Sequence, residues 1–446
     1  MKRELINENT FDSLLYYLTQ NLTYRNTIDE NIKKIIKEQL KDRKLFDNIL
    51  NIINENIDNK KTIINCIFFL MVLLQTSSNN EKSLFFTNEF IFLYKKLLVQ
   101  YQNDYEFISI IVDYFSQILI HSITNQNIII IFNKDNSLNL FELIYNSYKY
   151  CNSNSYFNFL ASFDKIIYSE ETKKFQFLLA EKVIEELIKI KYNEKLKHNK
   201  NNIINIYIIF ERLSLSSSNE ILETFFKKDK DDLFILDNII QLSNLFNELK
   251  NTTLYIIGNI ILSDENEINK NILQTNAFHF LKEILTNEKS TNINKKNVLW
   301  VMSNLCNDKI FYNEINTKHF FKDIIDLIKN INYIDAVKEG LDCFLNVILL
   351  GDKITNLNLI NLGLFQCIFI IIQNHNDKNI LKSCFNIILF LIEKGKLYEN
   401  NKNNIFFKKF NEFGGEEQIQ IIYKKVQSKD LILVIDNFID NYYSKH

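Results

Sequence analysis

Residues 298–308 read VLWVMSNLCND, with Trp300 and Asn304 four positions apart. Residues at this spacing lie on one face of an α-helix. One repeat earlier, residues 253–265 read TLYIIGNIILSDE and set Tyr255 and Asn259 at the same spacing. An asparagine amide both donates and accepts hydrogen bonds, and an aromatic ring packs well against an aliphatic stem that carries a cation. The recurring pair predicts a surface that holds an extended peptide through its lysines and arginines.

Apolar residues also recur at helical spacing along most of the chain, between short polar segments such as TSSNNEKS, CNSNS and LSSSNE. This pattern predicts helices of roughly 10 to 18 residues. With Asn304 as the marker of a repeat, the comparable positions are Gln75, Gln117, Asp164, Glu211, Asn259, Asn304, Asn346 and Phe390. The steps between them run from 42 to 48 residues. A period in the forties with three helices is typical of armadillo or HEAT-type solenoids.

We therefore expect an all-α fold, an armadillo-repeat, right-handed superhelical solenoid of about nine to ten three-helix repeats. Residues 26–446 are predicted to form one continuous repeat domain, and residues 1–25 a capping helix or an N-terminal lead-in. Composition agrees, because no proline and only 7 glycines among 446 residues leave few tight turns for a β fold.

The charge balance is close to neutral, with 52 basic and 54 acidic residues and a net charge of -2. Such a chain has no overall electrostatic attraction to nucleic acid, so DNA or RNA binding is not expected. The start MKRELINENTFDS lacks the apolar stretch of a signal peptide, and the apolar run IFFLMVLL is shorter than the ~20 residues that span a bilayer. We expect a protein that is soluble and does not bind membranes.

The reactive side chains show no pattern of a catalytic or metal site. The chain has six cysteines: Cys66, Cys151, Cys306, Cys343, Cys367 and Cys384. They form no CxxC pair and have no histidine at zinc spacing, which favours a reducing cytosolic or nuclear compartment. GxxxxGK[ST], GxGxxG, GxSxG and HExxH motifs are absent, and the six histidines are scattered. The sequence predicts no enzyme, no cofactor and no metal.

From about Ile203 to its end, the chain resembles the importin-α family, armadillo adaptors that carry proteins with basic nuclear localisation signals. The resemblance is clearest in YIIGNIILSDENEINKNILQTNAFHFLKEIL from Tyr255, in VLWVMSNLCND, and in NEFGGEEQIQIIYKKVQSKDLILVIDNFIDNYY from Asn411. It implies nuclear protein import, peptide grooves on the inner face, and a place in both cytoplasm and nucleus. The partners it implies are cargo signal peptides, importin-β and an export receptor.

The resemblance also implies which residues bind peptide in the groove on the later repeats. The candidates are Tyr255, Asn259, Glu265, Trp300, Ser303, Asn304, Glu339, Asp342 and Asn346. In the family pattern the asparagines hold the peptide backbone, the aromatic residues flank a lysine or arginine stem, and carboxylates pair with the cation. The chain departs from this pattern at Tyr255 and Asp342, which take tryptophan positions, and at Asn297, where a carboxylate is expected.

The groove on the earlier repeats departs further. Its positions here are Met71 and Gln75, Asp113 and Gln117, and Leu160 and Asp164, so the tryptophans and asparagines of the family are absent. The basic arm that binds importin-β is also missing, because residues 1–25 contain only Lys2, Arg3 and Arg25 as cationic side chains. Either the chain is a divergent adaptor without this arm, or it enters transport by another route.

Two functions therefore remain open. The first is an importin-α-like adaptor with its main peptide site on the later repeats. The second is an armadillo scaffold that binds another protein and has lost the transport role. For Trp300 and Asn304 the alternative to peptide binding is packing between repeats and a bond to a neighbouring carbonyl, and for Asp113, Asp164 and Glu211 it is a solvated helix face.

Overall fold

The computed structural model describes residues 44–76, 87–104, 106–112, 114, 173–198, 200–216, 218–263, 265–330, 333–398, 404–426 and 428–443. Most of these residues are helical, and within these ranges an isolated antiparallel β-bridge joins Lys228 to Phe234. The predicted all-α class is confirmed. Contacts divide the chain into two compact units, Met1–Val183 with Asn199–Arg212, and Ile184–His198 with Leu213–His446. The segment 1–25 lies outside the described residues, and the single domain of residues 26–446 stays a prediction.

The first unit contains α3 (Lys44–Glu55), α4 (Lys60–Thr76) and α6 (Asn88–Gln100). Helix α3 contacts both of the others, and its apolar residues, such as Ile49 and Ile53, recur at helical spacing and are buried. After α6, the Tyr101 hydroxyl donates to the carbonyl of Ile57 over 2.6 Å. Two further long helices, α12 (Lys173–Tyr192) and α14 (Lys200–Ser214), contain residues of both units, and α13 (Glu194–Lys197) lies between them.

The second unit repeats a group of three helices. The first helices are α15 (Asn219–Glu223), α18 (Asn266–Ile272), α21 (Tyr312–Thr317), α24 (Lys353–Asn361) and α27 (Ile405–Glu412). The second helices are α16 (Ile235–Ser243), α19 (Ala277–Thr286), α22 (Phe320–Ile328), α25 (Leu364–Asn374) and α28 (Gly415–Lys425). The third helices are α17 (Asn247–Ile261), α20 (Asn292–Leu305), α23 (Ile334–Leu350), α26 (Lys378–Tyr398) and α29 (Lys429–Tyr442). Two short 3-10 helices, η4 (Thr224–Phe226) and η5 (Lys309–Phe311), complete the first and third groups.

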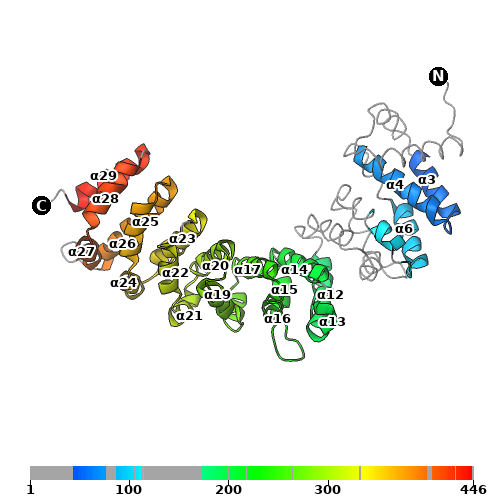
Figure 1. The fold of residues 1–446 in the computed structure, drawn as a ribbon, viewed down its shortest axis with the longest axis horizontal. Helices are drawn as coiled ribbons and strands as arrows, with labels where there is room; N and C mark the ends of the chain where they lie inside the picture. Colours follow the sequence, from blue (N-terminus) through cyan, green and yellow to red (C-terminus); the bar gives the residue numbers. More distant parts are fainter. Residues whose placement is uncertain are drawn as a thin grey trace, which may run out of the picture. The chain divides into compact units, whose positions relative to one another are not determined.

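Like helices pack on like helices in this unit. The second helices α16, α19, α22, α25 and α28 contact one another in order, and so do the third helices α17, α20, α23 and α26, as their succession along the unit in Figure 1 shows. Each repeat therefore buries its apolar face against the next, and side chains such as Val301 and Phe344 are fully buried. This is the armadillo-repeat solenoid that was predicted. The described residues of the second unit show five repeats, and the total of nine to ten stays a prediction.

The connection between the first and second helix of a repeat contains a left-handed residue in four places, the first of which is Asp232 with φ of 62°. Gly363 and Gly414 have φ of 98° and 84°, and His319 has φ of 59°. Glycine takes this conformation without a steric cost, whereas a residue with a Cβ is strained there. The Gly pair at residues 414 and 415 is thus a turn into the second helix of the last repeat.

An insertion distinguishes the first repeat of the second unit: eight residues, 227–234, separate η4 from α16. The carboxylate of Asp229 within it is fully buried and accepts hydrogen bonds from Lys191 Nζ over 2.6 Å and from Asn238 Nδ2 over 2.9 Å. The backbone amides of Asp231 and Leu233 also donate to it, over 2.8 and 3.1 Å. Burial by itself raises the pKa of Asp229, but these donors hold it well below the usual range. The loop is therefore fixed to α12 and α16.

At the other end of the unit, Lys425 joins the last two repeats. Its ammonium lies at the C-terminus of α25 and donates to the carbonyls of Ile372, Gln373 and His375 over 2.8, 2.9 and 3.1 Å. The last carbonyls of a helix have no partner within the helix, and a cation there also interacts favourably with the helix dipole. Lys425 on α28 thus caps the helix of the preceding repeat.

In the described part of the chain, each helix alone is too short or too polar to cross a bilayer. Helices α24 and α25 meet the criteria of length and composition only when taken together, and they are bent by 59° at the break between them.

Candidate functional site

Trp300 of α20 lies against α17, where it contacts Tyr255 and the backbone at Gly258. The centroids of the two aromatic rings are 5.8 Å apart, with an angle of 61° between their planes. A Cβ added to Gly258 would lie 2.1 Å from Cζ3 of the indole, so the ring requires a glycine at this position. Tyr255 remains 37% exposed, and Trp300 is partly buried. The structure thus brings together the two aromatic residues that the sequence singled out.

Two of the three candidate asparagines donate hydrogen bonds to the preceding repeat. Asn259 Nδ2 donates to Ser214 Oγ over 3.0 Å. Asn346 Nδ2 donates to the backbone oxygen of Ser303 over 3.0 Å and to its Oγ over 3.3 Å. We call these contacts the asparagine–serine bonds. The Oδ1 atoms of the two asparagines take no part in them.

Asn304 differs from these two asparagines. Asn346 donates to the residue just before Asn304, whereas the residue just before Asn259 is Gly258, which has no hydroxyl. Asn304 Nδ2 is shielded from solvent and has no acceptor among the described residues. An unpaired buried polar group of this kind costs about 1–3 kcal/mol. The indole of Trp300 lies against Gly258, at the position that corresponds to Ser303 in the next repeat.

The two asparagine–serine bonds reach different positions relative to the predicted markers. Asn346 donates to Ser303, the residue directly before the marker Asn304. Asn259 donates to Ser214, three residues after the predicted marker Glu211 and at the end of α14. The marker position in α14 stays a prediction.

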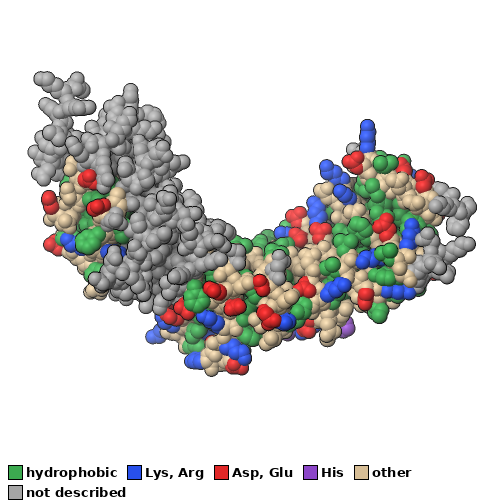
Figure 2. Space-filling model, turned by 180° about the vertical axis from the view of Figure 1, so that it is seen from behind, with side chains coloured by type: hydrophobic (Ala, Val, Ile, Leu, Met, Phe, Trp, Pro, Cys, Tyr) green, Lys and Arg blue, Asp and Glu red, His purple; other side chains and the backbone are tan. Residues whose placement is uncertain are grey.

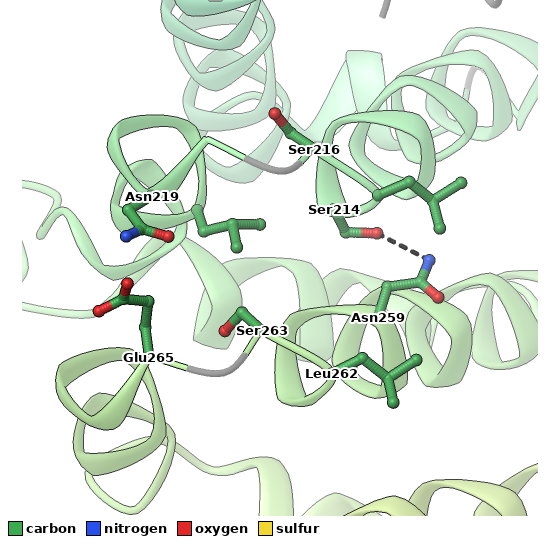
Figure 3. Close-up of a pocket in the computed structure, with 9 residues that line it drawn as sticks. Ser214, Ser216, Asn219, Asn259, Leu262, Ser263 and Glu265 are labelled. Carbon is green, nitrogen blue, oxygen red and sulfur yellow. Dashed lines mark hydrogen bonds between the residues drawn. The ribbon is translucent and has the colours of Figure 1, made fainter. Parts of the chain in front are cut away.

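An open hollow of about 440 Å³ lies beside Asn259, at the C-terminal ends of α14 and α17 (Figure 3). Its lining consists of Ser214, Leu215, Ser216, Asn219, Leu222, Asn259, Leu262, Ser263 and Glu265. In Figure 3, Asn219 and Glu265 face one another at one side of the hollow, and Ser214 and Asn259 lie at the other. Ser263 Oγ is buried and has no partner among the described residues. The hollow therefore combines leucine side chains with several hydrogen-bonding oxygens and one carboxylate.

One helical turn before Trp300, further side chains meet across the third helices. Asn297 is buried and donates from Nδ2 to Asn251 Oδ1 on α17 over 3.1 Å. The same position on α23 is Glu339, which interacts with Lys296 of α20. Burial raises the pKa of Glu339, neighbouring carboxylates raise it further, and Lys296 offsets part of this increase. A cation of the protein, Lys296, thus already offsets part of the electrostatic cost of ionising this candidate carboxylate.

Asp342 takes the position of the aromatic residue on α23. The residue is exposed overall, yet partial burial of its carboxyl raises its pKa. Asp342 also interacts with Glu339 on the same helix, and the negative charge of Asp342 raises the pKa of Glu339. The residue four positions before the marker is therefore aromatic on α17 and α20, as Tyr255 and Trp300, and acidic on α23, as Asp342.

Other candidate positions fall outside the part of the chain that the structure describes. They are the side chains of Met71 and Gln75, and the residues Asp113, Gln117, Leu160 and Asp164. Within the described ranges, no three His, Cys, Asp or Glu side chains are grouped to hold a metal ion. Figure 2 shows acidic and basic side chains interspersed among hydrophobic ones on the face in view, which agrees with the near-neutral net charge.

The sequence matches no protein-family model and no curated protein. The fold, by contrast, is similar to that of solved structures. An engineered protein aligns with a TM-score of 0.57 at 11% identity, over 96% of this chain and 98% of its own. A designed armadillo repeat protein in complex with a (KR)4 peptide aligns with a TM-score of 0.45 at 14% identity, over 58% of this chain and 98% of its own. Computationally designed armadillo repeat proteins for modular peptide recognition align with a TM-score of 0.45 at 13% identity, over 58% and 98%. At such low identity the likeness concerns the fold alone.

Six of the nine candidate residues thus form three local groups, each of which includes at least one residue of the third helices α17, α20 and α23. Trp300 lies with Tyr255, Asn259 lies with Glu265 around the hollow, and Asn346 lies with Ser303. Sequence reasoning missed the roles of Gly258, Ser214 and Lys296. Gly258 stands directly before the marker Asn259, as the candidate Ser303 stands before Asn304, and that adjacency is the signal that would have pointed to the glycine.

Proposed function

We propose that the second unit binds an extended basic peptide along α17, α20 and α23, in the manner of an importin-α-like adaptor. The observation that carries this proposal is the contact of Trp300 with Tyr255 and Gly258, next to asparagines at the same position of three successive repeats.

The peptide uses three kinds of contact. Its backbone N–H groups donate to the Oδ1 atoms of Asn259 and Asn346. The aliphatic stem of a lysine or arginine packs against the rings of Trp300 and Tyr255. A cation enters the hollow beside Glu265. Each hydrogen bond contributes about 0.5–1.5 kcal/mol, so a micromolar affinity, about 8 kcal/mol, requires several contacts at once.

In the cell, this activity is proposed to serve nuclear protein import. The ligands are then nuclear localisation signals, the partners are importin-β and an export receptor, and the protein is present in cytoplasm and nucleus. The support for this step is the resemblance of the later repeats to importin-α. The proposed activity is binding and includes no catalysis and no cofactor.

The test is fluorescence anisotropy of a labelled bipartite basic peptide with the full chain, at low and at physiological salt. We expect micromolar or tighter binding that weakens as salt increases, because charge pairs at a surface are screened. A peptide of the same length with glutamine in place of lysine and arginine is the ligand control. Replacing Trp300 and Asn304 together by alanine is expected to weaken binding severely while the helical content stays the same.

Tyr423→Ala is a matched control for Tyr255→Ala, because Tyr423 is 41% exposed on α28 and lies away from the candidate residues. Tyr255→Ala is expected to lower the affinity and Tyr423→Ala to leave it unchanged. An unchanged affinity in the folded Trp300 and Asn304 double variant removes this site from the proposal.

One observation favours the second candidate, an interaction scaffold whose partner is not a basic peptide. Lys296 interacts electrostatically with Glu339, so a cation of the protein already offsets part of the charge of one candidate carboxylate. Under this alternative, the basic peptide does not bind at low salt although the protein is folded. An acidic or uncharged peptide that binds better than the basic one also supports the scaffold.

A further inference from the structure

Two cysteines join α20 to α23 close to the bond between Asn346 and Ser303. The sulfur atoms of Cys306 and Cys343 are 3.2 Å apart, and both side chains are fully buried. Cys306 is three residues after Ser303, and Cys343 is three residues before Asn346. The thiol contact is therefore one helical turn from the asparagine–serine bond.

We propose that Cys306 and Cys343 form a reversible disulfide on exposure to a hydroperoxide, and that this bond fixes α20 against α23. The thiolate of one cysteine attacks a peroxide oxygen, which gives a sulfenic acid and, for hydrogen peroxide, one water. The second thiol then attacks the sulfenic sulfur, and a second water leaves. The two thiols lose two protons and two electrons, and hydrogen peroxide is reduced to two molecules of water.

The distance between the sulfur atoms sets this pair apart. A disulfide bond is about 2.05 Å long, so the two sulfurs need to approach by only about 1 Å. In the next repeat, Cys367 and Cys384 are also buried and interact electrostatically. Cys367, however, donates from its thiol to the carbonyl of Ile325 over 3.6 Å. Cys367 and Cys384 therefore provide an internal comparison, a buried pair without a sulfur contact.

Burial decides how fast the bond forms. It raises the pKa of the Cys306 thiol well above its ordinary value, so little thiolate is present at neutral pH. The hydroxyl of Tyr312, at the start of α21, donates to the carbonyl of Cys306 over 3.1 Å. Oxidation accordingly requires a local opening near Cys306, and low urea is expected to accelerate it.

The disulfide links the helix that carries Trp300 and Asn304 to the helix that carries Asp342 and Asn346. It limits relative movement of the two helices, whichever ligand they bind. The inference is independent of the proposed peptide, because it depends on the positions of two sulfur atoms. Its failure leaves the peptide proposal untouched, and the reverse also holds.

The experiment treats the full chain with hydrogen peroxide, alkylates the remaining thiols, and maps peptides by mass spectrometry without reduction. The expected product joins the peptides of Cys306 and Cys343, is lighter by two hydrogens than the two thiols together, and disappears with dithiothreitol. The melting temperature of the oxidised protein is expected to be higher by a few degrees, because the bond closes a loop of 37 residues.

Three variants serve as controls. Cys306→Ala and Cys343→Ala are expected to abolish the cross-link and the increase in melting temperature, and Cys384→Ala to keep both. The wild-type mass measurement requires no variant, so a variant that fails to fold does not affect it. Recovery of Cys306 and Cys343 as alkylated thiols after oxidation in low urea overturns the proposal. A Cys367–Cys384 product that forms equally fast also overturns it.

Discussion

The contact between α17 and α20 and the contact between α20 and α23 use the same repeat positions for different chemistry. In the first, Trp300 lies over Gly258, and Asn304 Nδ2 has no acceptor among the described residues. In the second, Asn346 donates to Ser303, and Cys306 touches Cys343. The first contact is aromatic and contains a buried amide that has no acceptor among the described residues, and the second is joined by a hydrogen-bonded asparagine and a thiol contact.

This difference indicates how a solenoid can place a binding site without changing its fold. Third helices pack against each other in both places. What differs is the residue directly before the marker, Gly258 or Ser303, and the residue four positions before the marker on the next helix, Trp300 or Asp342. Gly258 with Trp300 gives an aromatic contact, whereas Ser303 with Asp342 gives a contact that is hydrogen-bonded and acidic. The pairs at residues 258 and 300 and at residues 303 and 342 are therefore expected to be coupled.

The largest effect is expected for Gly258→Val. A side chain at this position displaces the indole, because even a Cβ would be 2.1 Å from it. Overpacking of this kind costs about 1–3 kcal/mol, and the loss of the aromatic surface should reduce peptide affinity at least tenfold. Urea unfolding followed by circular dichroism, together with peptide anisotropy, measures both effects. Unchanged stability and affinity would show that Trp300 does not depend on this glycine.

A double-variant cycle tests whether the two contacts are interchangeable. Gly258→Ser alone is expected to destabilise the protein, since the new side chain meets the indole. In a Trp300→Asp background the same change is expected to be neutral or stabilising, because the serine hydroxyl can then accept a bond from Asn304. The expected coupling free energy is about 1–2 kcal/mol, within the range for residues in contact. Additive effects in urea unfolding would contradict the idea of a coupled pair.

A smaller contrast is expected between the asparagines. Asn346→Ala removes its bonds to Ser303 and should cost about 1 kcal/mol of stability. Asn304→Ala removes a donor that has no acceptor among the described residues, so it should leave stability unchanged or raise it, while peptide affinity falls. Equal losses of stability in the two variants would mean that Asn304 has a partner in solution, such as an ordered water.

The smallest effect concerns pH. Burial raises the pKa of both Asp342 and Glu339, so folding favours their protonated forms. Their unfavourable contribution is present at neutral pH and is relieved as the pH falls through the raised pKa values. Asp342→Asn should therefore raise the melting temperature slightly at pH 7 and have no effect where the carboxyl is already protonated. Trp300→Phe, on the aromatic side, is expected to change the melting temperature by the same amount at every pH.

The sequence predicts some of these features much better than others. Long apolar helices recur at a nearly constant step, and for that reason the third helices and the markers at Asn259, Asn304 and Asn346 could be found. The marker Glu211 in α14 was placed by spacing and stays a prediction, because a shift of four residues keeps the same helix face and periodicity cannot detect it. The bond from Asn259 to Ser214 does not follow from that spacing, since Ser214 lies three residues after Glu211.

Other features depend on contacts between residues far apart in the chain, and the local sequence pattern does not indicate such contacts. The insertion at residues 227–234 reads as an ordinary polar segment, although Asp229 within it is fully buried. The dependence of Trp300 on Gly258 links two helices that are 42 positions apart in sequence. The electrostatic interaction of Lys296 with Glu339 likewise joins two helices, and the family resemblance did not indicate it.

The cap that Lys425 provides to α25 has a consequence for how the second unit comes apart. In a solenoid each repeat is held by its neighbours, so bonds across the boundary between two repeats determine whether these repeats open separately or together. Because the ammonium of Lys425 is bonded to three carbonyls of the preceding repeat, the last two repeats should open as one cooperative segment. The amides of α25 and α28 would then exchange their hydrogens at a common rate, and Lys425→Met would let α28 exchange first.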